Sequence, residues 1–418
     1  MNANDQSLSD LQPVILGADI GVYALARAFH RQYGVRSIVI CGAVTGPIAD
    51  SRILETRVIG DSHDEQQLVA ALLEVVAELP ERRLVLLANS DFLVSVIVHN
   101  RAVLEKHYVV PFLSAELLDE LSDKARFAEL CERTGVGTPR TIVQDFANAG
   151  SDDWQPVPVD FDYPLIAKAS SSAEYERVEF DGKMKVFEIG SPDELDRLWR
   201  SLRDAGFRGR FVVQELIPGD DTQMWSVTAY VDRHGTVSMA CSAHVLLEEH
   251  TPASLGNPCA MITVRNDEML DQARRLLDAS GYVGFANFDI KVDPRDGSQR
   301  FLEVNPRIGR NNNYVLAAGA NPAEFLVRDW VLDEEVAPVV AERRVLYTIL
   351  PKGLLLKYVR DAELRDQVEE LYRQRRVVHP LVYRADRSMR RNWYILLAKV
   401  NQLRKFRRYY PAPSASGF

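Results

Sequence analysis

Two neighbouring stretches of the sequence hold side chains that could bind a divalent cation. Asp289 lies in one apolar run, and Glu303 and Asn305 lie two residues apart in the next run. Because side chains alternate along a strand, Glu303 and Asn305 point to one face, and Asp289 on an adjacent strand can reach the same place. Two carboxylates and an amide oxygen are hard ligands that suit Mg²⁺ or Mn²⁺ and suit zinc poorly. The pattern predicts a magnesium site.

Two arginines follow the second run at once. Arg307 comes directly after Asn305 and Pro306, and Arg310 follows after Ile308 and Gly309. Cations beside a magnesium ion are typical of phosphate chemistry, because they stabilise the negative charge of a phosphoryl group during transfer. The alternative interpretation is a surface hairpin with ordinary charges, and a Glu-x-Asn-Pro-Arg string inside an apolar strand argues against it.

The first 120 residues alternate between short apolar runs and segments with helical spacing. Strands are expected at residues 13–17, 37–41 and 84–88, and helices at 22–33 and 66–79. Strand–helix alternation with apolar strands is typical of a doubly wound parallel sheet.

From residue 121 onward, strands and helices mix without strict alternation, which indicates an α+β unit. A helix is expected at residues 117–134, followed by a polar loop over residues 150–164. The strands expected at residues 287–292 and 300–304 would pair in antiparallel fashion and carry the predicted metal ligands. Further strands are expected at residues 165–168, 211–215, 225–231, 287–292 and 300–304, and further helices at residues 192–205 and 269–280.

A glycine-containing turn follows the first expected strand. Gly17 and Gly21 form an incomplete dinucleotide-binding fingerprint, a motif in which glycines let the backbone approach a phosphate. Ala24 replaces the third glycine, and no convincing acidic ribose partner closes the second strand. A tight turn is the favoured interpretation, and an NAD(P)-dependent oxidoreductase is kept as the alternative function.

The composition is that of an ordinary soluble globular protein. The chain has 418 residues, of which 46% are hydrophobic and 26% charged, which suggests two to three domains. No apolar run approaches the roughly 18 residues of a membrane span, and the polar N-terminus does not resemble a signal peptide. The four cysteines form no CxxC pair, so we expect a cytoplasmic protein without disulfides.

The net charge of −9 is unevenly distributed. Residues 341–418 contain 18 Lys or Arg against 7 Asp or Glu, so the rest of the chain is strongly acidic. An acidic body argues against nucleic acid as the main partner. Residues 395–403 have helical spacing and lie among arginines, which predicts a basic amphipathic helix. Such a helix can lie on an anionic membrane, dock on the acidic body, bind a partner or grip a phosphorylated substrate.

The stretch around Asp289 and Glu303 resembles the metal-binding signature of the ATP-grasp superfamily, in the branch of the carbamoyl phosphate synthetase large subunit and biotin carboxylase. Other landmarks of that family follow in the same order over about residues 10–330. Lys124 takes the place of a helix residue that contacts ATP phosphates, and Lys168 takes the place of the second phosphate-binding cation.

The segment from Gln214 to Asp221 resembles the family's adenine hinge. The resemblance implies that backbone groups at Glu215 and Ile217, with Leu216 between them, hold the adenine and that Asp221 holds the ribose. His250 and Thr251 resemble a substrate-side loop of the family, and we take His250 as a candidate catalytic residue.

The chain departs from the family pattern after Lys168, where a glycine-rich loop usually closes over the phosphates. Here the loop contains Ser170, Ser171 and Ser172 and no glycine. Serine hydroxyls and backbone N–H groups can still bond phosphate oxygens, and a plain serine-rich turn is the alternative.

The resemblance implies an ATP-dependent ligase that activates a carboxylate as an acyl phosphate and joins it to an amine. Arg307 would stabilise the acyl phosphate and the oxyanion, and Arg310 would bind the substrate carboxylate. The implied organisation is a pre-ATP-grasp domain at 1–120, an ATP-grasp core at 121–335 and a basic extension at 336–418. This arrangement is similar to bacterial D-aspartate ligases, which attach an amino acid to an amine of a peptidoglycan precursor.

Overall fold

The computed structural model describes residues 8–151, 153–170, 175, 178–184 and 186–414. The chain divides into two compact units, each with its own hydrophobic core. Unit 1 consists of Met1–Ala115, Gly219–Phe288 and Asn305–Phe418, and unit 2 consists of Glu116–Pro218 and Asp289–Val304.

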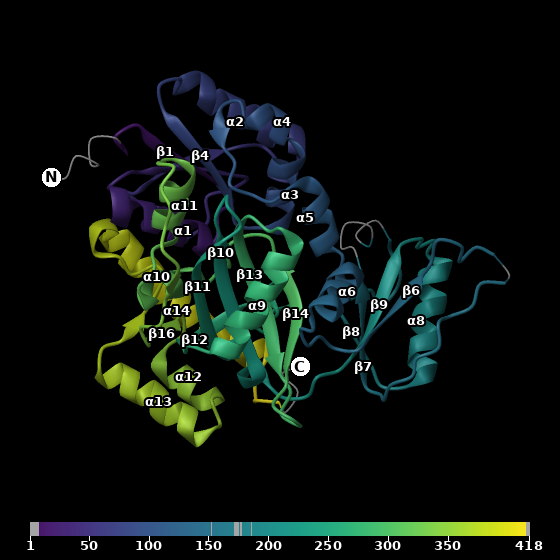
Figure 1. Cartoon of the computed structure of the whole chain (residues 1–418). Coiled ribbons are helices and arrows are strands. Elements are labelled where there is room, and N and C mark those ends of the chain that lie inside the picture. The colour runs from purple at the N-terminus through teal and green to yellow at the C-terminus, as the bar shows by residue number, and fades with distance from the viewer. Residues whose placement is uncertain (1–7, 152, 171–174, 176–177, 185, 415–418) are drawn as a thin grey trace. The chain divides into compact units, whose positions relative to one another are not determined.

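The N-terminal part of unit 1 is a five-stranded parallel sheet flanked by helices (Figure 1). Its strand order is β3-β2-β1-β4-β5, and all four pairings are parallel. The predicted doubly wound α/β fold is therefore confirmed. The elements are β1 (Leu11–Leu16), α1 (Ile20–Tyr33), β2 (Ser37–Cys41), β3 (Leu54–Val58), α2 (Glu65–Glu78), β4 (Arg83–Ala88), α3 (Asp91–His99), α4 (Arg101–Leu104) and β5 (Tyr108–Val109).

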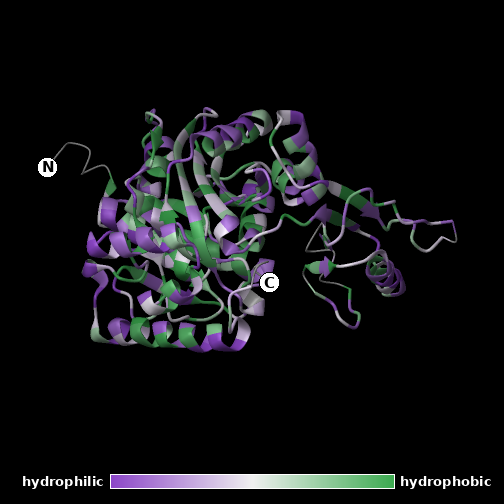
Figure 2. Ribbon diagram, turned by 90° about the horizontal axis from the view of Figure 1, so that it is seen from below, coloured by the Kyte–Doolittle hydropathy of each residue, from purple (hydrophilic) through white to green (hydrophobic). Residues whose placement is uncertain are grey.

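Burial explains why these runs are strands. All five residues of β2 are buried, as is nearly all of β1 and β4, which is expected for a parallel sheet covered on both faces. Figure 2 shows hydrophobic residues concentrated in the strands, whereas the covering helices alternate hydrophobic and hydrophilic positions. On α1, Val22, Leu25, Ala26 and Phe29 form the buried stripe that the spacing predicts.

A second, eight-stranded sheet has the order β14-β13-β10-β11-β12-β16-β17, with β15 paired to β11. Helix α9 lies against β10 and β11 in this sheet (Figure 1). The unit boundary falls within β13 and β14, after Phe288 and after Val304. The elements are η2 (Asp221–Gln223), β10 (Met224–Val231), β11 (Val237–Glu248), η3 (Pro252–Ser254), β12 (Pro258–Thr263), α9 (Asp267–Ser280), β13 (Gly284–Val292), β14 (Gln299–Asn305), α10 (Asn313–Ala318), α11 (Pro322–Trp330), β15 (Val339–Val340), β16 (Leu346–Thr348) and β17 (Val377–Val378).

Unit 2 is built on a four-stranded antiparallel sheet of order β6-β9-β7-β8. Its core is aromatic, with Phe146, Phe207 and Phe211 fully buried and in edge-to-face contact with one another or with Trp199. The elements are α5 (Ala115–Ser122), α6 (Lys124–Thr134), β6 (Thr141–Asp145), β7 (Leu165–Ala169), β8 (Phe187–Ile189), α8 (Pro192–Asp204) and β9 (Arg210–Glu215).

The single helix expected at residues 117–134 is wrong. The structure has two helices, α5 and α6, separated at Asp123. Asp123 has an extended backbone, and its carboxylate accepts hydrogen bonds from the backbone N–H groups of Ala125 and Arg126. Because aspartate is a strong N-cap, it starts a new helix at Lys124.

The C-terminal residues belong to unit 1 and end in a long helix. Ser388 caps this helix, α14, which begins at Met389 and confirms the helical spacing predicted for residues 395–403. All four cysteines carry free, buried thiols, as expected. Within the described part of the chain, no helix is both long and apolar enough to cross a membrane. The elements are α12 (Lys352–Tyr358), α13 (Ala362–Arg373), η4 (Arg384–Asp386) and α14 (Met389–Tyr409).

Candidate active site

The predicted metal ligands lie on two neighbouring strands. Asp289 is on β13, and Glu303 and Asn305 are on β14, with both carboxylates half-buried and Asn305 buried. The amide of Asn305 donates to the backbone oxygen of Asn287 at 3.3 Å. This donor set fits magnesium, which is usually bound through one or two carboxylates together with substrate phosphates. Among the described residues, no group of three or more His, Cys, Asp and Glu side chains is arranged to hold a metal ion. The predicted set has only two such side chains, because its third ligand is the amide of Asn305.

Arg307 is held by an acid that sequence reasoning missed. Its Nε lies 2.9 Å from Oδ1 of Asp91, and its Nη2 donates to Oδ1 of Asn305 at 3.0 Å. Asp91 is the first residue of α3, shortly after the end of β4, where an acid is also favoured by the helix dipole. An acid just after a buried parallel strand was the available signal. The guanidinium thus ties a predicted metal ligand to the edge of the N-terminal sheet.

Arg310 has a similar partner at the end of the first strand. Its Nε lies 3.3 Å from Oδ2 of Asp19. The other oxygen of Asp19 accepts from the backbone N–H groups of Gly21 and Val22 and from the amide of Asn89 at 2.7 Å. Asp19 and Asn89 follow the carboxyl ends of two adjacent parallel strands, which is where ligands bind in folds of this kind.

This arrangement settles the role of the glycine-containing turn. The Asp19 carboxylate occupies the first backbone N–H groups of α1, which a cofactor phosphate would need. A Cβ on Gly21 would lie 2.9 Å from the Arg310 backbone and 2.3 Å from the Asn89 amide nitrogen. Gly21 therefore allows close approach of the arginine loop, and Gly17, with φ of 114°, makes the favoured tight turn.

The predicted phosphate-binding residues lie in unit 2. Lys124 is the first residue of α6, and Lys168 is on β7; both are half-buried. Ser170 is almost fully buried, and its hydroxyl donates to Asp123 at 2.9 Å, while Asp123 also forms an ion pair with Arg210. In this structure Ser170 therefore supports the cap of α6. Ser171 and Ser172 lie outside the described residues.

The predicted adenine hinge leaves the end of β9. The Gln214 amide donates to the Thr141 hydroxyl at 3.0 Å, and the Glu215 carboxylate pairs with Arg295 at 2.5 Å. Both contacts lie within unit 2, and they engage the side chains of Gln214 and Glu215 with neighbouring residues. Leu216 is half-buried and Ile217 is buried, so backbone groups are the polar atoms that this segment can offer an adenine.

Asp221 and His250 form a hydrogen-bonded pair within unit 1. Nε2 of His250 lies 2.9 Å from Oδ2 of Asp221, which also accepts from the backbone N–H of Glu248. The imidazole stacks on Tyr410 with ring centroids 3.6 Å apart and planes within 2°. Sequence reasoning missed Tyr410, because a contact between residues 160 positions apart has no local signal. The predicted catalytic histidine is thus covered by the C-terminal segment, and it is hydrogen-bonded to the predicted ribose acid.

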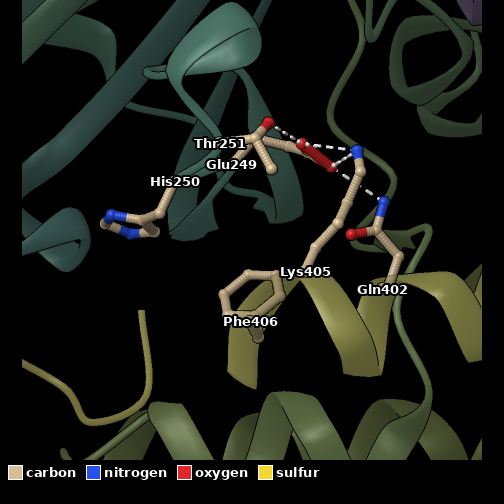
Figure 3. A pocket seen from close by; sticks show the side chains of 6 residues that line it. All are labelled: Glu249, His250, Thr251, Gln402, Lys405 and Phe406. Atoms are coloured by element: carbon tan, nitrogen blue, oxygen red, sulfur yellow. Dashed lines mark hydrogen bonds and ion pairs between the residues drawn. The ribbon is translucent and has the colours of Figure 1, made fainter. Parts of the chain in front are cut away.

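Helix α14 also holds the loop that carries His250 (Figure 3). The buried Glu249 carboxylate accepts from Gln402 at 2.8 Å, from Lys405 at 3.0 Å and from Thr251 at 3.0 Å. Burial acts to raise the pKa of Glu249, but the hydrogen bonds from Gln402 and Lys405 and the charge of Lys405 outweigh it, so the pKa lies below its ordinary value. Glu249 is therefore a carboxylate held in its charged form by the C-terminal helix.

Comparison with known proteins identifies the class. Residues 225–319 match the family model described as carbamoyl-phosphate synthase L chain, ATP binding domain. The L-amino acid ligase of Bacillus licheniformis has the same fold, with a TM-score of 0.54 and 14% identity over 77% of this chain and 74% of that one. The biotin carboxylase domain of the Hydrogenobacter thermophilus 2-oxoglutarate carboxylase gives a TM-score of 0.57, 16% identity and coverage of 80% and 72%. The chain is an ATP-grasp protein.

A relative at the level of the whole chain identifies the family. The D-aspartate ligase of Enterococcus faecium (strain Aus0004) is 30% identical over 408 residues, which cover 95% of this chain and 96% of that protein. The D-alanine–D-alanine ligase of Pseudomonas entomophila is 22% identical over 50% of this chain and 62% of that one. The chain belongs to the D-aspartate ligase family and is an ATP-dependent ligase that forms C–N bonds. This finding overturns the oxidoreductase alternative.

Proposed function

We propose that this ligase activates the carboxylate of D-aspartate and joins it to an amine of a peptidoglycan precursor. The near full-length match to the D-aspartate ligase of Enterococcus faecium supports the acid substrate. The observation that carries the proposal is the pair Arg307 and Arg310, each ion-paired to an acid at the carboxyl edge of the parallel sheet. Two guanidinium groups suit a substrate that carries two carboxylates.

The first step is phosphoryl transfer to the substrate. A carboxylate oxygen attacks the γ-phosphorus of ATP, the bond to the bridging oxygen breaks, and ADP leaves with that electron pair. In this proposal Lys124 and Lys168 hold the phosphate chain, and the backbone of the segment from Gln214 to Ile217 holds the adenine. Mg²⁺ or Mn²⁺, when bound, would neutralise phosphate charge.

Asp289, Glu303 and Asn305 would hold that cation. Their oxygens are the ligand type it prefers, and Arg307 already bonds to Asn305, so a phosphoryl group near the cation would also be near a guanidinium. Asp221 and His250 are bonded to each other, so any role in binding the ribose or the substrate is shared by both.

The second step forms the amide. The amine nitrogen attacks the acyl carbon, phosphate leaves with the electron pair of the C–O bond, and the nitrogen loses its proton. Arg307 would stabilise the oxyanion that forms during the attack, and Arg310 would hold the second carboxylate of the acid. The Arg310 side chain is one-third exposed, compared with 17% for Arg307, so Arg310 is the more accessible of the two.

The remaining expectations complete the proposal. A pre-ATP-grasp domain at 1–120, an ATP-grasp core at 121–335 and an extension at 336–418 would divide the tasks, and the enzyme would act in the cytoplasm on small-molecule substrates. The basic extension would contact an anionic membrane surface or the peptidoglycan precursor.

A screen of ADP release tests the proposal. D- and L-aspartate, D- and L-asparagine, D-alanine and D-glutamate are each combined with a nucleotide-linked peptidoglycan precursor or with free lysine. We expect turnover with D-aspartate and the precursor, and little with L-aspartate or D-asparagine. Turnover that favours D-alanine, or any acid with a single carboxylate, would contradict the proposed role of the two arginines.

A further inference from the structure

Helix α14 has an inner face that binds the body of unit 1. Arg391, Gln402 and Phe406 are its buried residues. Arg391 forms an ion pair with the buried Asp386 at 3.2 Å, and Lys405 pairs with the buried Glu249 at 3.0 Å. The inner face therefore combines buried ion pairs with the apolar contact of Phe406, and its carboxylate partners are Asp386 of the extension and Glu249 of the preceding part of the chain. Figure 3 shows Gln402, Lys405 and Phe406 pointing from this helix toward the Glu249 loop.

The outer face of the same helix is apolar and exposed. Its large side chains recur at intervals of three or four residues, so they form one stripe along the helix. Trp393 and Leu397 are each 60% exposed, although such residues are usually covered in a soluble protein. We define the α14 outer face by the exposed residues Met389, Trp393, Leu396, Leu397, Val400 and Leu403.

Positive charge surrounds this stripe. The helix contains seven Arg or Lys and no Asp or Glu. Two of the seven are used on the inner face, and Arg390 pairs with Asp50 while remaining largely exposed. The exposed Arg404, Arg407 and Arg408 follow the stripe toward its C-terminal end. The outer face therefore combines an apolar centre with a cationic end.

We propose that the α14 outer face docks on the surface of a membrane with anionic lipids. Trp393 and the leucines would enter the boundary between headgroups and acyl chains, and the arginines would contact lipid phosphates. A helix of 21 residues is about 31 Å long, so it can lie flat on such a surface. Of the two partners proposed above for the extension, a membrane surface and the peptidoglycan precursor, this proposal selects the membrane surface. It does not depend on the ligase reaction.

Charge argues against the other occupants. Two copies of the outer face packed together would bring their arginines into one interface without a carboxylate from either helix. A single precursor molecule could use the arginines, but it would leave most of a stripe that runs from Met389 to Leu403 in water. An anionic bilayer satisfies the apolar and the charged parts at once.

Co-sedimentation of the full chain with lipid vesicles tests the proposal. We expect binding to phosphatidylglycerol vesicles, weakened by salt, and little binding to phosphatidylcholine. Trp393→Gln with Leu397→Gln should reduce binding at least tenfold. Arg404→Gln, Arg407→Gln and Arg408→Gln together should reduce it about 100-fold, because each basic residue near an anionic surface contributes a factor of about five. Val44→Gln with Val58→Gln, which are exposed elsewhere in unit 1, should leave it unchanged.

Three outcomes would overturn the proposal. The first is absence of vesicle binding by the wild-type chain, and the second is equal binding by the α14 variants. The third is that the outer face instead forms dimers, as measured by light scattering, or binds the soluble precursor. Thermal melting confirms that each variant is folded. ADP release with soluble substrates is measured in parallel and should stay unchanged in the α14 variants, so failure of the ligase proposal is distinguished from failure of this one.

Discussion

At the scale of single residues, Glu303 is the sharpest test of the metal site. Glu303→Gln keeps the shape of the side chain and removes one charge from the proposed cation ligands. Phosphate charge then stays partly uncompensated, which costs several kcal/mol in the transition state, so turnover should fall at least 100-fold while the melting temperature is kept. The measurement is ADP release at saturating ATP and Mg²⁺. Full activity in this variant would exclude the assignment.

The Arg307 guanidinium contacts both Asp91 and Asn305, so substitution by lysine would lose at least one of these contacts. Lysine keeps the charge but cannot donate to both partners and still present a fork to an oxyanion. Arg307→Lys should lower kcat by about 10²–10³ and change the KM for ATP little. Arg265→Lys, at an exposed ion pair, is the matched control. A normal kcat with a raised KM for ATP would place Arg307 on the nucleotide instead.

Glu249 makes the stability of the protein depend on pH. Its pKa is lowered in the folded chain, so the charged form contributes stability that is present above the ordinary glutamate pKa of about 4.3. That contribution is lost as pH falls through the lower, folded pKa. In urea unfolding, the wild type and Glu249→Gln should therefore differ most at neutral pH and converge as the pH falls below the folded pKa of Glu249. An unchanged difference at low pH would show that the Lys405 pair does not stabilise the fold.

At the scale of elements, the contact between α1 and the arginine loop predicts that Gly21 tolerates no side chain. Gly21→Ala would push a methyl group into the Arg310 backbone and the Asn89 amide, so it should destabilise the chain by about 1–3 kcal/mol and reduce ligase activity. Gly353→Ala in α12 is the control, because a Cβ added there would meet no described atom within 4 Å apart from its chain neighbours and its own helix backbone. That control should be neutral or slightly stabilising. Equal melting temperatures for the two variants would contradict the close approach.

The expected elements show which signals are local. The strands and helices of the parallel sheet follow from apolar runs and helical spacing, since burial on both faces requires continuous hydrophobic strands. The break at Asp123 was missed because hydrophobic periodicity continues through it, and only the capping preference of aspartate marks it. Asp19 and Asp91 were missed because their importance comes from the edge of the sheet on which they lie.

At the scale of the whole molecule, the C-terminal extension is part of the structure of unit 1. Truncation before Asn392 removes Phe406, Tyr410 and Lys405, and so uncovers His250 and leaves the buried Glu249 without its cation. We expect the truncated chain to melt at a clearly lower temperature or to aggregate, since removing one partner of a buried charge pair is strongly destabilising. Differential scanning fluorimetry and yield of soluble protein measure this. A truncated chain that melts like the full chain would show that the helix is only an appendage.

The sequence by itself determined the class of protein and most of its elements. The Asp289, Glu303 and Asn305 pattern, the two lysines and the predicted adenine hinge occur in the order that the ATP-grasp superfamily shows, so the resemblance could be recognised without the structure. Only the tertiary structure decided that Asp19 and Asp91 anchor the two arginines and that Tyr410 covers His250. Each of these contacts joins residues far apart in the chain, so its energy arises on packing and leaves no periodicity or spacing to read. The same holds for α14, because the sequence predicts a basic amphipathic helix but not which side is covered. Only packing shows that Arg391, Gln402 and Phe406 turn inward and that the apolar outer face stays exposed.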